Sequence, residues 1–376
     1  MVVITSMLMG GFGEVCQDSA PLDIYRQLHH FQHTRESYYS HVPAPEVTNL
    51  REFQLEPINS VAALLHWKAL LLIAARLDTE EREYWREMFP APPGMLPQRQ
   101  RPQAFDAHFH LDRTLHSMGL PPRASLHAIF NGTEVEEDKE VDVVGTYASF
   151  CDPDTYPSAE RLLDLPRDMV VAVGLHPKTK FQSSREVDDC FRHLRKLVQQ
   201  ERVTAVGEVG LDHSVPMRDW HYIMVNLQKI LPLVTTRHVL VLHCRGMSHD
   251  NGTEVYMLLL SLVRQGVSRD QRIYLHCFNG DRYVLDQWTT AFPNLYLGFT
   301  RLVTSFTPHQ SEALRKVEEG RILLETDAPY FSVRGRPWSA PNQLYSVAES
   351  VAAVLQMTPE RLLEITTANA RRLFRQ

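Results

Sequence analysis

The sequence lacks the cysteine and charge patterns that mark several large classes of protein. Its five cysteines, Cys16, Cys151, Cys190, Cys244 and Cys277, are widely spaced, and none belongs to a Cys-x-x-Cys pair. We therefore expect reduced thiols, as in cytosolic or nuclear proteins, rather than a disulfide framework. The formal net charge is −6, so the chain has no overall basic character of the kind that indicates nucleic-acid binding.

Signals for membranes and for export are also missing. The longest apolar run, residues 61–77, contains His66, Lys68 and Arg76. It is too short and too charged to cross a bilayer. Residues 1–9 are apolar, but no Lys or Arg precedes them, so this stretch lacks the basic region of a signal peptide. We expect a soluble protein of the cytoplasm or nucleus, or both, without a membrane partner.

The composition allows a large core, because 44% of the 376 residues are hydrophobic and 22% are charged. This length suggests two domains, or one large α/β barrel with an appendage. Residues 1–102 differ from the rest, since residues 59–77 have helical apolar spacing and residues 90–97 are rich in proline. We predict a mainly helical N-terminal extension with a proline-rich linker. A cap packed on the main domain is the default interpretation; a module for an unknown protein partner is the alternative.

From residue 103 onwards, short β-branched runs alternate with helical patterns. The eight runs are residues 103–111, 141–150, 169–177, 203–212, 239–246, 272–280, 294–300 and 321–329. The helical patterns are residues 186–200, 218–235, 253–265, 281–292, 308–319, 343–355 and 358–374. Eight apolar strands alternating with helices predict an α/β fold, a parallel (β/α)8 barrel of the TIM type over residues 103–376. A doubly wound open sheet is the competing fold.

The first of these strands carries two histidines, His108 and His110, among apolar neighbours. On a strand, positions i and i+2 point to the same face, so the two imidazoles would be directed at one point. Neutral imidazole is a common metal ligand. The motif alone fits a metal site and a strand with two incidental histidines about equally well.

Further residues of the ligand type follow the other strands. The ends of six strands carry, in order, His108 and His110, His176, Glu208, His243, His276, and Asp327. In a barrel these ends meet at one face, and a buried Glu or His there is costly unless it is paired or metal-bound. Even without His176, the remaining four histidines and two carboxylates exceed the three protein ligands usual for one catalytic zinc. We therefore expect two divalent metals bridged by Glu208, which would activate water and hold a phosphate oxygen.

The motifs, taken together and in this order, resemble one known family. The segments are FDAHFHL, VGLHP, AVGEVGLD, LHCRG, LHCFNG, LETDAPY and RGRPWSAPN. They are similar to the signature series of the TatD family of metal-dependent deoxyribonucleases, which belongs to the amidohydrolase-type barrels. The match covers about residues 103–374, and residues 1–102 lie outside it. The resemblance implies a hydrolase that cleaves phosphodiester bonds of DNA, and RNA as a further substrate, by trimming 3′ ends towards the 5′ end.

The resemblance also implies a division of the ligands between two metals. His108 and His110 would hold the first metal together with Glu208 and Asp327. Glu208 would bridge to the second metal, which His243 and His276 complete. Asp327 would also act as the base that takes a proton from the attacking water. The ligand set suits Mg²⁺, Mn²⁺, Zn²⁺ or Co²⁺.

Other matched positions would contact the substrate. His176 would lie near the scissile phosphate as a catalytic residue. The expected substrate-binding residues are Arg245, Cys277, Tyr330, Arg334 and Arg336. The chain departs from the family at His213, where an aromatic residue is common. A further phosphate contact, an extra ligand and a plain surface histidine are the alternatives, and the last is favoured. Cys151 is expected in the core, Cys244 against the surrounding helices, and Glu325 behind a metal ligand; Asp106 either supports a ligand in the same way or caps the strand end.

Two other functions remain open at this level. The same barrel and metal site can hydrolyse a small ester, amide or lactone. The cations at Arg245, Arg334 and Arg336 argue against a neutral substrate. The second alternative is a barrel without activity that binds a partner through residues 1–102, and the intact ligand set argues against it.

Overall fold

The computed structural model describes residues 101–247, 252–333 and 335–375. The contacts divide the chain into two units, Met1–Gln100 and Arg101–Gln376, and the description below concerns the second. The predicted helical extension and linker therefore lie outside the described residues, apart from 101 and 102. The predicted substrate contact of Arg334 lies outside them as well.

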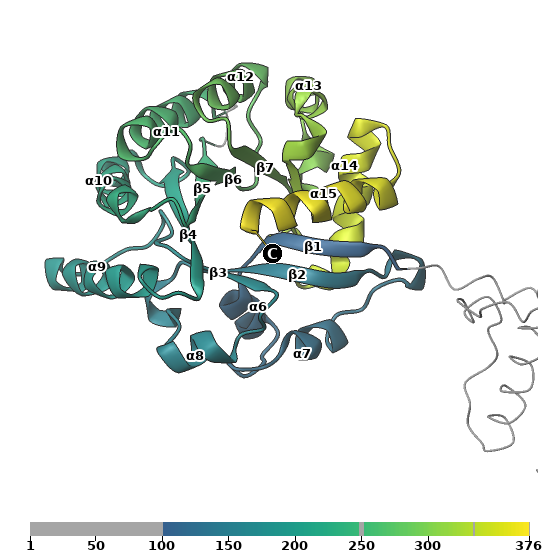
Figure 1. Cartoon of the computed structure of the whole chain (residues 1–376), viewed down its shortest axis with the longest axis horizontal. Helices are drawn as coiled ribbons and strands as arrows, with labels where there is room; N and C mark the ends of the chain where they lie inside the picture. The colour runs from purple at the N-terminus through teal and green to yellow at the C-terminus, as the bar shows by residue number, and fades with distance from the viewer. Residues whose placement is uncertain (1–100, 248–251, 334, 376) are drawn as a thin grey trace, which may run out of the picture. The chain divides into compact units, whose positions relative to one another are not determined.

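Eight parallel strands form one sheet in chain order, β1 to β8, and curve into a nearly closed barrel (Figure 1). The strands are β1 (Gln103–Phe109), β2 (Asp142–Phe150), β3 (Met169–Val173), β4 (Val203–Asp212), β5 (Val239–Arg245), β6 (Arg272–Leu275), β7 (Leu295–Phe299) and β8 (Ile322–Leu324). The predicted TIM-type barrel is thus confirmed. Several strands end earlier than predicted, so that His110, His176, His276 and Asp327 lie in the segments that follow them rather than on strands.

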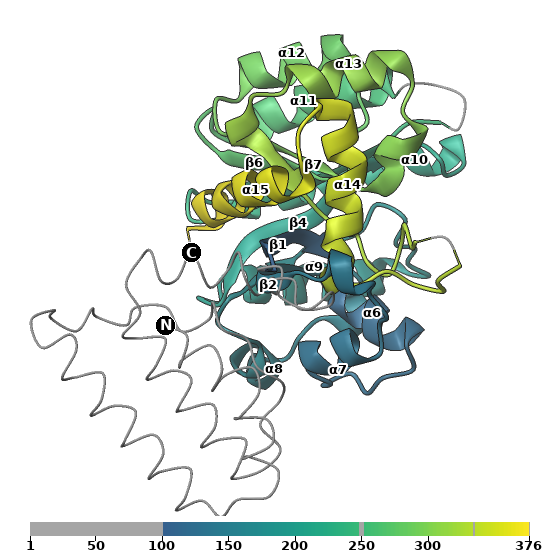
Figure 2. The same cartoon turned by 90° about the vertical axis from the view of Figure 1, so that its right-hand side faces the viewer.

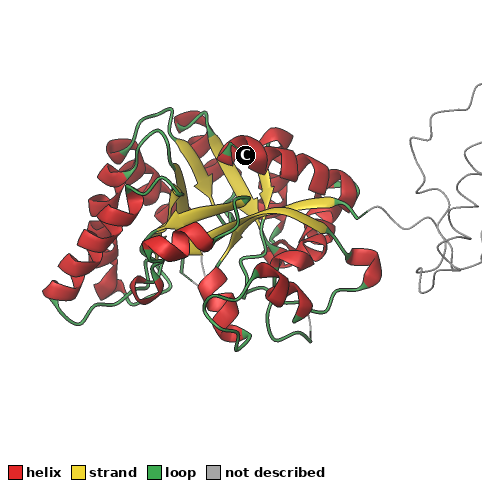
Figure 3. Ribbon diagram, turned by 60° about the horizontal axis from the view of Figure 1, so that its bottom comes forward, coloured by secondary structure: helices red, strands yellow, loops and turns green. Residues whose placement is uncertain are grey.

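Helices surround the strands on the outside, as the ribbon coloured by secondary structure makes plain (Figure 3). The longer helices are α9 (Ser184–Val198), α10 (Trp220–Ile230), α11 (Thr253–Gly266), α12 (Arg282–Ala291), α13 (Pro308–Lys316), α14 (Leu344–Leu355) and α15 (Pro359–Phe374). Three short helices, α6 (Leu111–Ser117), α7 (Leu126–Asn131) and α8 (Ala159–Asp164), cover the early strands. They lie on the side of the barrel opposite α12 and α13 (Figures 1 and 2). No helix of the described residues combines the length and the apolar character needed to span a membrane.

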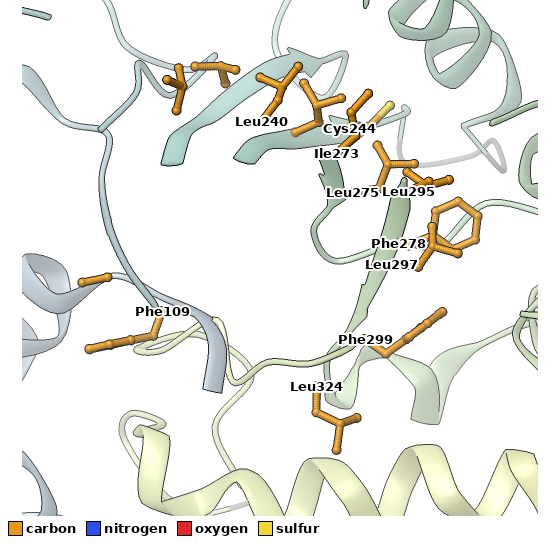
Figure 4. Close-up of a cluster of buried hydrophobic side chains, with 14 of the residues drawn as sticks. Phe109, Leu240, Cys244, Ile273, Leu275, Phe278, Leu295, Leu297, Phe299 and Leu324 are labelled. Carbon is orange, nitrogen blue, oxygen red and sulfur yellow. The ribbon is translucent and has the colours of Figure 1, made fainter. Parts of the chain in front are cut away.

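The strands have apolar side chains on both faces because both faces are covered. All five residues of β3 are buried. The larger hydrophobic cluster lies between strands and helices, where Leu275, Leu297, Phe299 and Leu324 point away from the centre of the ring of strands (Figure 4). Each buried side chain of this size contributes about 1.5–3 kcal/mol of hydrophobic free energy. This outer layer therefore holds the helices in place and fixes the strand ends that carry the site.

A second cluster fills the inside of the barrel at the amino ends of the strands. Phe374, the last residue of α15, stacks on Phe105 with ring centroids 5.8 Å apart and lies 5.6 Å from the ring of Tyr147. Arg272, at the start of β6, donates a hydrogen bond to the carbonyl of Leu373 over 2.5 Å. The end of α15 thus closes the amino side of the barrel, and the carboxyl side is left for chemistry.

The first strand meets the segment that follows the last one. The amide of Asp327 donates to the carbonyl of His108 over 2.9 Å, and the amide of His110 donates to the carbonyl of Ala328 over 2.8 Å. These two hydrogen bonds bring residues from opposite ends of the domain to one place. Asp327 itself has a φ of 50°, in the left-handed region that a non-glycine residue adopts at some energetic cost.

Candidate metal centre

A cavity of about 620 Å³ opens at the carboxyl ends of the strands. The predicted residues that line it are His110, His176, Glu208, His243, Arg245, His276, Cys277, Asp327 and Tyr330. His108 is not part of the lining, and its side chain is completely buried. The structure therefore brings the predicted ligands to one face of the barrel, and their individual roles remain predictions.

Glu208 lies at the centre of these residues and is only 1% exposed. Its Oε2 atom lies 3.8 Å from His108 Nε2 and 3.4 Å from His110 Nε2. The Oδ1 atom of Asp327 lies 3.8 Å and 3.3 Å from the same two nitrogens. The four ligands predicted for the first metal thus converge on one point.

The other oxygen of Glu208 faces a different group of side chains. Its Oε1 atom lies 2.5 Å from His243 Nδ1 and 3.0 Å from His276 Nε2. These two nitrogens are 3.4 Å apart. The ligands predicted for the second metal therefore converge as well, and one carboxylate contacts both groups through separate oxygens.

His176 approaches the second group but is oriented differently. Its Nε2 atom lies 3.6 Å from Glu208 Oε1, while its Nδ1 atom accepts a hydrogen bond from the amide of Lys178 over 3.1 Å. A neutral ring with Nδ1 as acceptor carries its hydrogen on Nε2. Nε2 is then a donor facing the cavity rather than a lone pair available to a metal. This tautomer suits contact with a phosphate oxygen better than coordination.

The charges around Glu208 favour bound cations. Burial alone would raise the pKa of Glu208, but nearby histidines, His176 first among them, lower it well below its usual value. Burial lowers the pKa of His243 and His276, but Glu208 together with a second carboxylate at each ring, Asp212 or Glu325, outweighs burial and raises both pKa values. Burial lowers the pKa of His108 well below its usual value and keeps this ring neutral. The carboxylate thus attracts positive charge, and protons and metal cations compete to supply it.

Unpaired buried atoms provide a direct test of whether a metal would fit. Within the described residues, His108 Nδ1 and Nε2, His276 Nδ1 and Asp327 Oδ1 are buried without a hydrogen-bond partner. Leaving such a group unpaired costs roughly 1–3 kcal/mol, which coordination would offset at His108 Nε2 and Asp327 Oδ1. The candidate ligand atoms of His108, His110 and Glu208 all lie within 4.8 Å of one another. This set of nitrogen and oxygen donors fits divalent cations.

Two buried carboxylates support ligands from behind. Asp212 Oδ2 lies 3.0 Å from His243 Nε2 and 3.2 Å from Lys178 Nζ. Glu325 Oε1 lies 3.7 Å from His276 Nδ1. Partners of this kind fix the orientation of ligand rings. This position was expected for Glu325. No role was predicted for Asp212 or Lys178, because the spacing of the motifs does not show that they lie beside His243.

Asp106 ties β1 to the segment after β8. Its Oδ1 atom accepts from the amide of Thr326 over 2.9 Å and from the amide of His108 over 3.3 Å, and its Oδ2 accepts from the Thr326 hydroxyl over 2.5 Å. Burial raises the pKa of Asp106 to about 8. Of the two expectations for this residue, its contacts fit a structural tie at the strand end better than direct support of a ligand side chain.

The end of β2 also reaches the site, which sequence analysis did not predict. Arg113 pairs with Asp152 through two hydrogen bonds, and Arg113 Nη1 lies 3.4 Å from His110 Nε2. The Cys151 thiol, expected to be an ordinary core residue, is buried but lies 3.6 Å from His110 Nδ1 and 3.8 Å from Glu208 Oε2. Cys151 and Asp152 are residues of the ligand type directly after the second apolar run, and this signal was missed; the folded chain shows which groups they contact.

The predicted substrate-binding residues have different positions. Arg245 is exposed and lines the cavity, as do Cys277 and Tyr330. Arg336 instead pairs with Glu134 on the surface and is not part of the lining. Its predicted phosphate contact would require this ion pair to open, and it stays a prediction.

Two other expectations concern residues next to the ligands. His213 is half-buried and stacks on Trp220, with ring centroids 3.7 Å apart, so it is not a free surface histidine. Cys244 is buried in the cluster between strands and helices, as expected from its alternation with His243. The stacking of His213 accounts for a ring at a position where an aromatic residue is common in the resembling family.

Comparisons with known proteins agree with this geometry. Residues 105–375 match the family model of the TatD related DNases. A human protein, the 3′-5′ RNA nuclease TATDN2, is 27% identical over 317 residues, which are 78% of this chain and 39% of that protein. The uncharacterized metal-dependent hydrolase YabD of Bacillus subtilis is 25% identical, over 72% of this chain and 98% of its own length. The chain thus spans well under half the length of the human relative.

A solved structure shows the same fold. The crystal structure of YJJV, a TatD homolog from Escherichia coli K12, superposes with a TM-score of 0.54 at 19% identity, over 73% of this chain and 98% of that one. The family match covers the whole barrel, from β1 to α15, and includes every residue of the candidate metal centre. The resemblance inferred from the motifs is therefore confirmed. The chain belongs to the family of TatD-related DNases.

Proposed function

We propose that this chain is a divalent-metal-dependent nuclease that hydrolyses phosphodiester bonds, with two metal ions bridged by Glu208. The observation that carries this proposal is that the two oxygens of Glu208 face two separate groups of ligands. His108, His110 and Asp327 would hold one ion, and His243 and His276 the other. When bound, such ions lower the pKa of water and stabilise the charge that develops on a phosphate group.

The side chains of the cavity would do the remaining work. Asp327, which lines the cavity, would take the proton from the attacking water with the carboxylate oxygen that does not face His108 and His110. His176 would donate from Nε2 to a phosphate oxygen, because the amide of Lys178 occupies its Nδ1. Arg245 would hold the strand through a further phosphate, as its planar guanidinium suits that geometry.

Single-stranded DNA and RNA are the proposed substrates, cleaved from the 3′ end. The family model is described as that of DNases, and the human relative is named as a 3′-5′ RNA nuclease. Two divalent ions together with the lining cations, Arg113, Lys178 and Arg245, would outweigh the four lining carboxylates and favour an anionic substrate over a neutral amide or lactone.

The test uses the purified full chain with Mn²⁺ or Mg²⁺ and 5′-labelled single strands of DNA and RNA. We expect a ladder of products that shorten from the 3′ end, and we expect Glu208→Ala to abolish it. Glu349→Ala is the matched control, because Glu349 pairs with Lys139 rather than with any ligand. Absence of cleavage with every divalent metal would refute the proposed function.

A further inference from the structure

Arg113 uses only one edge of its guanidinium to hold its ion pair. Nε donates to Asp152 Oδ2 over 2.7 Å, and Nη2 donates to Asp152 Oδ1 over 2.8 Å. This two-point pairing fixes the plane of the guanidinium as well as its position. The arginine side chain is 20% exposed and that of the aspartate is 34% exposed, so the pair is partly shielded from water. Asp152 therefore holds the guanidinium of Arg113 in a fixed orientation, and Arg113 is described below as mounted on Asp152.

The opposite corner of the same guanidinium is directed at the metal centre. Nη1 lies 3.3 Å from the hydroxyl of Tyr330 and 3.4 Å from Nε2 of His110. All three residues line the cavity. A structural ion pair does not need this orientation, since its two hydrogen bonds are already complete at Asp152. This corner, which donates one hydrogen bond to Tyr330, is the part of the guanidinium that Asp152 does not use.

Tyr330 and His110 cannot both accept a hydrogen bond from Nη1 when a metal is bound. Nη1 carries two hydrogens, and Tyr330 can accept one of them. The other points towards His110 Nε2, the nitrogen that also faces Glu208 Oε2 and Asp327 Oδ1. A nitrogen that coordinates a metal has no lone pair left to accept a hydrogen bond. In the loaded enzyme this N–H of Arg113 would face the cavity with its charge and without an acceptor in the chain.

We propose that Arg113, mounted on Asp152, is a substrate-binding residue that donates from Nη1 to an anionic oxygen of the phosphate group at the metal centre. This inference rests on the proposed function, because it concerns the phosphate that the nuclease would cleave. If Arg113 binds the substrate, the segment after β2 contributes to the substrate site, because Asp152 holds Arg113. Arg113 also gives the site a fixed cation on the side of His110, whereas Arg245 projects from β5.

The test compares Arg113→Gln, Arg113→Lys and Asp152→Asn with the unchanged full chain. Arg321→Gln is the matched control, since Arg321 forms a 2.7 Å ion pair with Glu318 and is 24% exposed, but precedes β8 at the amino side of the barrel. Cleavage of a labelled strand gives kcat and KM. Fluorescence anisotropy with a strand protected by phosphorothioate linkages gives Kd at several salt concentrations. Metal content and Tm are measured for every variant.

We expect Arg113→Gln to lower kcat/KM about tenfold to hundredfold, the range for one lost hydrogen bond between charged groups. The slope of log Kd against log salt should fall by about 0.7, as for one lost phosphate contact on a single strand. Arg113→Lys should recover part of the affinity, because it keeps the charge but lacks the second point of attachment. Asp152→Asn should raise KM less than Arg113→Gln does, because the arginine remains but its mount is weakened.

The outcomes separate this inference from the proposed function. If Arg113→Gln behaves like Arg321→Gln in KM, Kd and salt slope while the unchanged chain cleaves, Arg113 is structural and only the inference is overturned. If Arg113→Gln loses metal, the residue acts through His110, and the inference is again overturned. If the unchanged chain binds the strand but never cleaves it, the proposed function fails and the Kd values decide the inference. If it neither binds nor cleaves, both fail.

Discussion

The substitution Glu208→Gln tests whether Glu208 is a ligand of two metal ions or of one. The substitution keeps the size of the side chain and removes its charge. One of the two atoms that now face separate ligand groups becomes an amide nitrogen, which donates hydrogen bonds and does not bind metals. The other becomes an uncharged amide oxygen, which binds a divalent cation more weakly than a carboxylate oxygen does. Since Glu208 is only 1% exposed and its oxygens lie 2.5–3.8 Å from the nitrogens of both groups, the amide cannot supply a ligand oxygen to both ions.

The size of the effect follows from the number of ligands. Binding of a zinc ion by four ligands is worth about 10–16 kcal/mol, so one ligand contributes roughly 3 kcal/mol, or about a hundredfold in affinity. A bridging Glu208 contributes to both ions. Asp327 Oδ1 lies near His108 and His110 only, so it contributes to one. Glu208→Gln should therefore weaken two sites and Asp327→Asn a single site.

The assay is a metal titration by calorimetry, together with the metal content of the dialysed protein. We expect two equivalents of Mn²⁺ or Zn²⁺ for the unchanged chain, one tight equivalent for Asp327→Asn, and none of comparable affinity for Glu208→Gln. Glu349→Ala should bind like the unchanged chain. Retention of one tight ion by Glu208→Gln would refute the bridging role, and retention of both would refute any role as a ligand.

Three further predictions concern stability and metal removal. Phe374→Ala should lower the free energy of unfolding by about 3–5 kcal/mol in urea denaturation, because it opens a cavity at the closed end of the barrel; a loss below about 1 kcal/mol would contradict that packing. Burial lowers the pKa of His238 to about 4, below its value of about 6.5 in the unfolded chain, so stability should be complete above pH 6.5 and fall by about 2–3 kcal/mol towards pH 4. His238→Gln should remove that part of the pH dependence, and an unchanged slope would exclude His238 as its cause. Chelation by EDTA should abolish cleavage and lower Tm, and re-addition of Mn²⁺ should restore both; an unchanged Tm would mean that no ion stabilises the fold.

Much of the barrel was predictable because its strands are covered on both sides. A strand such as β3, buried along its whole length, must be a continuous apolar run, and that run is visible in the sequence. A charged or imidazole side chain at the end of such a run is costly to bury, so Glu208 and His276 stood out for the same reason. The order of the runs then placed these residues at one face. The ends of the strands were less predictable. For example, β8 ends at Leu324 because the backbone turns there, and the apolar pattern does not encode this turn.

The directions in which the ligand side chains point depend on irregular pairing between neighbouring strands. The pairing of β4 with β5 shifts register between Val206 and Val209, on either side of Glu208. The pairing of β1 with β2 shifts between Asp106 and Phe109, around His108. Bulges of this kind turn a side chain away from simple alternation and are frequent beside active sites. A strict two-residue period therefore gave the correct face for these ligands but not their directions.

The sequence by itself determined the eight-stranded barrel, the family and the set of candidate ligands, because burial imposes apolar periodicity and makes buried polar residues conspicuous. Only the tertiary structure decided which oxygen of Glu208 faces which histidines, because that depends on register and side-chain direction. It also decided that Arg113 is mounted on Asp152, 39 positions away, and that Arg336 pairs with Glu134. Contacts between charged side chains on separate segments leave no periodic trace in a sequence, since they are fixed by where the folded backbone carries each segment.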